Sequence, residues 1–141
     1  MKIKGLAILL CCAGILFTCY VASFYIPLMT ARGRFCELSE LPWPEEGRLV
    51  KEEHHTHGRA FSRLFIVEVP VHRIKDWVKT VQASNGIRWN RSQLSLYPPL
   101  MPYSLWEDEY LWCTFNLEYR NHVMVVVDEQ AERLYVERWG N

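Results

Sequence analysis

The fold is decided by residues 111 to 127, LWCTFNLEYRNHVMVVV, near the end of a chain of 141 residues. From Leu111 to Tyr119 apolar residues alternate with mostly polar ones. This alternation predicts a strand with one face in the core and the other partly exposed to water. Arg120 and Asn121 predict a turn. The next stretch, Val123 to Val127, is apolar on both faces, so we expect it to form a strand at the centre of a sheet.

Working outward, the same periodicity defines the rest of the sheet. Asp128 to Glu132 predicts another turn, and Leu134 to Trp139 alternates again, which completes a three-strand meander. Upstream, Leu64 to Val69 is rich in β-branched and aromatic residues and predicts a further strand. Between these strands a helix is predicted to begin at Pro70 and to stop at Asn85 and Gly86, because apolar residues recur at helical spacing at Ile74, Trp77, Val78 and Val81.

This order of elements predicts an α+β domain over residues 61–141. We expect a small two-layer fold in which an antiparallel sheet of about four strands is covered by one helix. The preceding residues 30–60 carry prolines and glycines among charged residues and show no sustained apolar period. They are predicted to form a tether.

The N-terminal segment from Gly5 to Met29 contains no Asp, Glu, Lys, Arg or His. Because about 20 apolar residues span a bilayer as a helix, the segment predicts a single-pass transmembrane helix or uncleaved signal anchor. Residues 1–4 would then be a cytoplasmic head, with the C-terminal domain extracytoplasmic. A secreted form with a cleaved signal, and a form lipidated at Cys19, are the alternatives.

Composition limits the classes of partner. The chain has 16 basic and 16 acidic residues, and such a balance argues against a nucleic-acid partner, whose phosphates require a concentrated basic surface. Outside the apolar segment the chain contains two cysteines, Cys36 and Cys113. Independent thiols are favoured slightly over a disulfide between them, because sequence separation does not show whether their Cα atoms come close.

The long connection from Ile87 to Tyr110 is the main candidate binding region. A loop of this length in a compact domain usually has a function, and aromatic side chains often anchor protein interfaces. The predicted partner-binding residues are Trp89, Tyr97, Tyr103 and Trp106. The alternative is that these rings fold back and cover the second face of the sheet.

Metal-type ligands cluster at one place, in the sequence EEHHTH from Glu52 to His57. A metal site needs side chains that converge and are held in place. Because the cluster lies in the predicted tether, a solvated charged linker is the preferred interpretation, and no metal site or cofactor is predicted. Metal handling by His54, His55 and His57 is the alternative function.

Catalytic patterns are weak throughout the chain. The serines lack the glycine context of a strained nucleophile turn, and a dyad of Cys113 and His122 would need a particular register between two strands. We therefore predict no catalytic residues and no enzyme activity. The expected function is that of a membrane-anchored protein whose extracytoplasmic domain binds another protein through the aromatic loop, within an envelope complex or as an inhibitor or immunity factor.

Overall fold

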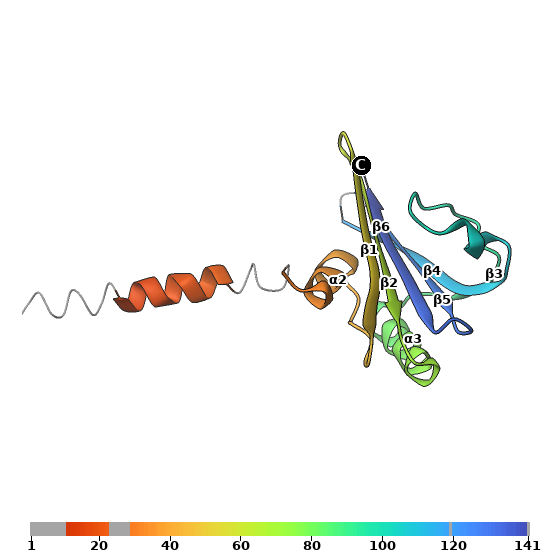
Figure 1. The fold of residues 1–141 in the computed structure, drawn as a ribbon, viewed down its shortest axis with the longest axis horizontal. Helices are drawn as coiled ribbons and strands as arrows, with labels where there is room; N and C mark the ends of the chain where they lie inside the picture. Colours follow the sequence, from red (N-terminus) through yellow and green to blue (C-terminus); the bar gives the residue numbers. More distant parts are fainter. Residues whose placement is uncertain (1–10, 23–28, 119, 141) are drawn as a thin grey trace, which may run out of the picture.

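The computed structural model describes residues 11–22, 29–118 and 120–140. Within these residues the chain forms a six-stranded sheet in the order β1-β2-β6-β5-β4-β3 (Figure 1), and every neighbouring pair is antiparallel. The strands are β1 Arg48–His57, β2 Ala60–Glu68, β3 Asn90–Ser92, β4 Tyr110–Leu117, β5 Asn121–Asp128 and β6 Arg133–Gly140. The helices are α2 Ala31–Ser39, α3 Val71–Asn85 and the 3-10 helix η1 Tyr103–Trp106, and residues 11–22 are also helical.

The predicted meander is present as β4, β5 and β6, and the predicted helix as α3. Gly86 caps α3 with a positive φ of 62°, a conformation that glycine adopts at little steric cost. The predicted sheet of about four strands under one helix is wrong. The described residues form two more strands, β1 and β3, at opposite edges of the sheet, and a second helix, α2, contributes to the same core cluster as α3.

The predicted transmembrane helix is contradicted. Residues 5–10 and 23–28 of the predicted segment, and the head 1–4, lie outside the described residues. Across the described ranges 11–22, 29–118 and 120–140, no helix has both the length and the apolar character to cross a membrane. The correction extends to the membrane localisation and the extracytoplasmic placement that were derived from this helix.

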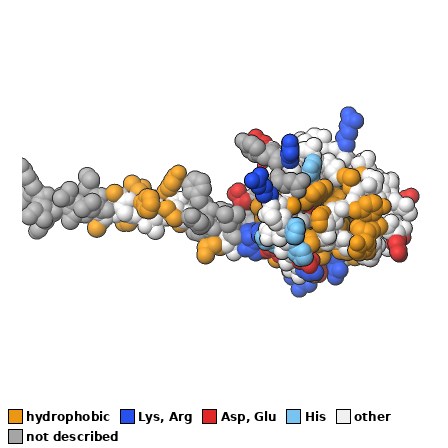
Figure 2. Space-filling model, turned by 90° about the horizontal axis from the view of Figure 1, so that it is seen from above, with side chains coloured by type: hydrophobic (Ala, Val, Ile, Leu, Met, Phe, Trp, Pro, Cys, Tyr) orange, Lys and Arg blue, Asp and Glu red, His pale blue; other side chains and the backbone are white. Residues whose placement is uncertain are grey.

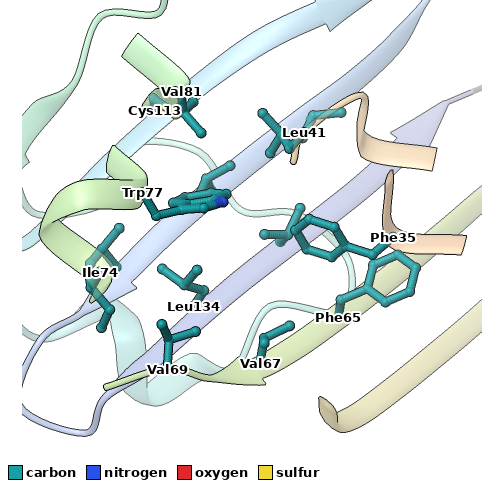
Figure 3. Packing of buried hydrophobic residues seen from close by; sticks show 14 of the residues in the cluster. Phe35, Leu41, Phe65, Val67, Val69, Ile74, Trp77, Val81, Cys113 and Leu134 are labelled. Carbon is teal, nitrogen blue, oxygen red and sulfur yellow. The ribbon is translucent and has the colours of Figure 1, made fainter. Parts of the chain in front are cut away.

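Two helices cover one face of the sheet. Valines from β2 and β5 point toward this face, and α3 contributes Ile74, Trp77 and Val81. The ring of Phe35 from α2 lies edge-on to Phe65, with 5.6 Å between ring centroids, and Figure 3 shows the two rings side by side. Phe35 is fully buried, so α2 belongs to the core and is not an appendage.

Residues 30–60 are therefore a structured part of the domain and not the predicted tether. The guanidinium of Arg34 on α2 pairs with the carboxylate of Glu52 on β1 at 2.6 Å, and the indole N–H of Trp77 donates to the Pro42 carbonyl at 2.7 Å. Strand β1 was not predicted, because its sequence, RLVKEEHHTH, does not alternate between apolar and polar residues. As an edge strand it needs one paired neighbour, and its charges protect the free edge from further pairing.

The second face of the sheet is covered by the connection between β3 and β4, residues 93–109, which lies opposite α3 in Figure 1. From this connection Leu94, Met101 and Leu105 are buried against the sheet. They pack on side chains from four strands, Leu64, Ile66, Trp112, Met124, Val126 and Tyr135. The sheet is thus buried on both faces, which explains why β5 is apolar on both sides.

Candidate functional site

The connection between β3 and β4 presents an exposed cluster of aromatic rings. Its buried residues, Leu94, Met101 and Leu105, alternate along the chain with residues that face solvent. Tyr97 and Tyr103 are 64% and 77% exposed, although tyrosine carries an apolar ring. Figure 2 shows hydrophobic side chains gathered on this end of the domain.

Both tyrosines pack on Trp106, which is partly buried. The ring centroids of Tyr97 and Trp106 are 4.5 Å apart at an interplanar angle of 75°. Those of Tyr103 and Trp106 are 4.0 Å apart at 72°. We call these three residues the aromatic cluster. The structure brings them together, and part of the indole packs against the core while both tyrosines are exposed to solvent.

Trp89, the fourth residue of the predicted partner surface, lies elsewhere. It packs against the helix-covered face, where its ring is 6.4 Å from the ring of Trp77 on α3. It precedes β3, which pairs with β4 at the edge of the sheet. Trp89 is therefore a partly buried residue that packs against the core on the opposite face of the sheet, and the aromatic cluster does not include it.

A buried carboxylate holds the connection in place. Glu137 on β6 is 0% exposed, and its Oε1 accepts hydrogen bonds from the Ser62 hydroxyl and from the backbone N–H of Leu100, the latter at 2.9 Å. Its Oε2 has no hydrogen-bond partner among the described residues. Burial raises the pKa of Glu137, and the hydrogen bonds from Ser62 and the loop amides oppose this shift.

Sequence reasoning did not identify Glu137 as the buried carboxylate that anchors the connection. In the alternation of β6 it shares a face with Tyr135 and Trp139, and a carboxylate between two aromatic residues on one strand face was the available signal. A lone glutamate in a strand is usually solvated, so this signal alone does not distinguish a buried anchor from a surface residue.

The histidine cluster does not converge. Glu52 and His54 stand opposite Phe65 and Arg63 of β2, whereas His55 stands opposite Ser62. Because successive side chains of a strand point to opposite faces, His54 is separated from His55 and His57. No group of three or more metal-type ligands forms among the residues that the structure describes.

Cys113 and His122 also lie on opposite faces of the sheet. Cys113 is buried in the helix-covered core opposite Val125. His122 stands opposite Asn116 and stacks on Trp139, with ring centroids 5.5 Å apart. The register therefore excludes a direct dyad. Cys36, which is partly buried, and Cys113 are both free thiols.

The thiol of Cys113 is expected to be inert in the native protein. Burial raises its pKa to about 12, and the thiolate is the reactive form. Peptide mass spectrometry after alkylation at neutral pH should find Cys113 unlabelled in native protein and labelled in denaturant. The exposed Cys11, Cys12 and Cys19 are internal controls. Rapid native labelling of Cys113 would contradict the buried position.

Comparisons of the chain with protein-family models, with curated proteins and with solved structures found no match. No function is therefore carried over by similarity.

Proposed function

We propose that this domain is a non-enzymatic protein-binding module and that the aromatic cluster is its contact surface. The observation that carries the proposal is the exposure of Tyr97 and Tyr103, which stand at 64% and 77% while packing on one partly buried tryptophan. Tyrosine and tryptophan are enriched among the residues that dominate binding energies, because they bury large areas while losing few rotamers.

The anchoring of the cluster supports this role. Buried Met101 and Leu105 flank Tyr103 in the sequence, and the carboxylate of Glu137 binds the N–H of Leu100. Prolines at positions 98, 99 and 102 further restrict the backbone. A contact surface that is already ordered loses less conformational entropy on association, so more of the interaction energy is available for binding.

The test compares two variants of the full chain with the wild type. Affinity purification from extracts of the source cells should recover the same partner with the wild type and with Val50→Ala, a truncation at an exposed residue of β1. Tyr97→Ala combined with Tyr103→Ala should lose it. Titration of the purified partner should then show an affinity at least about tenfold weaker for the double variant.

Circular dichroism and thermal melts provide the folding control. Because both tyrosines are exposed, the double variant should keep the wild-type spectrum and a stability within about 1 kcal/mol of wild type. Equal recovery of every protein by a folded double variant and by the wild type would show that the aromatic cluster is not the contact surface.

A further inference from the structure

We infer that the partner meets the aromatic cluster through a basic segment, with a lysine or arginine side chain lying on the exposed tyrosine rings. This inference rests on the proposed function, because it names the chemistry of the partner for the same surface. It is carried by the rings themselves and by the charges that follow them in the chain.

The rings offer a cation a suitable surface. The face of an aromatic ring carries negative electrostatic potential, and a guanidinium or ammonium group within about 6 Å of its centroid is attracted to it. Both tyrosine rings stand at 72° to 75° to the indole, so the cluster is not a flat stack. The long apolar stem of a lysine or arginine can pack on the same rings.

The charges next to the cluster favour the same ligand. Trp106 is followed directly by Glu107, Asp108 and Glu109, and all three are exposed. Among the described residues, no lysine or arginine forms an ion pair with any of them. Figure 2 shows acidic side chains beside the hydrophobic patch at this end of the domain.

A hollow continues this acidic surface beyond the cluster. It has a volume of about 560 Å³, and its lining includes Asp108 and Glu109 together with Asp128 at the end of β5 and Glu129 in the turn that follows. Arg91 is the one basic residue of this lining, and its guanidinium is 3.7 Å from the carboxylate of Glu129. The hollow therefore adds carboxylates beside Glu107 to Glu109 whose charge is complementary to that of a basic segment.

The alternative partners are disfavoured by the same charges. An acidic segment or a nucleic acid would bring like charges together at Glu107 to Glu109. The chain as a whole has a formal net charge of zero, so this acidity is a local feature of the surface. The aromatic cluster and its acidic border are contiguous in the chain, since Glu107 directly follows Trp106.

The experiment is a selection from a displayed library of random peptides on the immobilised full chain. Peptides that also bind the Tyr97→Ala/Tyr103→Ala variant are removed by counter-selection. We expect the remaining peptides to be enriched in lysine or arginine. Their affinity should fall at least about tenfold on the double tyrosine variant and should weaken as the salt concentration is raised.

A charge variant with a matched control tests the acidic border. Glu107→Gln, Asp108→Asn and Glu109→Gln together should weaken binding of a selected basic peptide by about fivefold or more. The control is Glu37→Gln, Glu40→Gln and Asp76→Asn, which makes the same change in net charge at exposed positions on or beside α2 and α3. It should leave the affinity within about twofold of wild type.

The outcomes separate this inference from the proposed function. Cluster-dependent peptides that are acidic, proline-rich or similar to this chain itself would overturn the basic partner and leave the protein-binding role in place. Equal weakening by the two charge variants would overturn the acidic border in the same way. Failure to obtain any cluster-dependent peptide, together with equal partner recovery in the purification described above, would overturn both.

Discussion

Replacing Phe35 with alanine is expected to lower the free energy of unfolding by about 3–5 kcal/mol. The ring is fully buried and packs edge-on against Trp43 and Phe65, with centroid distances of 5.2 and 5.6 Å. Truncation removes these contacts and leaves a cavity between α2 and the sheet (Figure 3). Urea denaturation followed by circular dichroism measures the change.

Two variants of the same helix are the controls. Glu37→Ala lies on the exposed side of α2 and should change stability by no more than about 0.5 kcal/mol. Phe35→Leu keeps much of the buried volume and should lose less than the alanine variant. A Phe35→Ala variant as stable as Glu37→Ala would mean that α2 contributes little to the core.

The part of the fold that the sequence predicted is the part with strong apolar periodicity. Strands β4, β5 and β6 and helix α3 each place at least one apolar row of side chains against the core, so the periods of 2 and 3.6 are visible in their residues. Helix α2 buries few side chains, chiefly Phe35 and Ser39. A helix that contributes so little of its surface to the core leaves a weak pattern, which explains its assignment to a tether.

The two edge strands, β1 and β3, were not predicted from the sequence for a related reason. Strand β3 has three residues, too few for any period, and β1 is largely polar on both faces. Their pairing depends on backbone hydrogen bonds, which no side-chain pattern reports. The transmembrane prediction erred differently, because it used composition and run length.

The candidate site was predicted in part. The density of aromatic residues and prolines identified the connection, and the structure brings Tyr97, Tyr103 and Trp106 together. It separates Trp89 from them, because the rings of one loop can reach either face of the sheet. Which ring goes to which face depends on the β3 and β4 register and on buried contacts such as that of Glu137, and neither is encoded locally.

Glu137→Ala is the second substitution with a large expected effect, a loss of about 2–4 kcal/mol in the free energy of unfolding. It leaves the buried Ser62 hydroxyl and the N–H of Leu100 without their acceptor. Hydrogen exchange should accelerate at the amides of Leu100 and Met101 in particular. Wild-type exchange rates at these amides would contradict an anchoring role.

Glu137→Gln separates the charge of this residue from its shape. Because the folded pKa is raised above the usual value of 4.5, the native state holds the proton more tightly than the unfolded chain does. Stability therefore falls as pH rises from the unfolded pKa through the folded pKa. The glutamine variant lacks this decline, so its stability relative to wild type should increase over the same range. Denaturation at a series of pH values between about 4 and about 8 measures the difference.

These two variants also connect the anchor to binding. Neither changes an atom of the aromatic cluster, but Glu137→Ala releases the backbone between Tyr97 and Tyr103, whereas Glu137→Gln retains an acceptor for Leu100. If the cluster binds as an ordered surface, the alanine variant must order the connection again on association and should bind more weakly than the glutamine variant. Equal affinities of the two folded variants would show that anchoring by Glu137 contributes to stability alone.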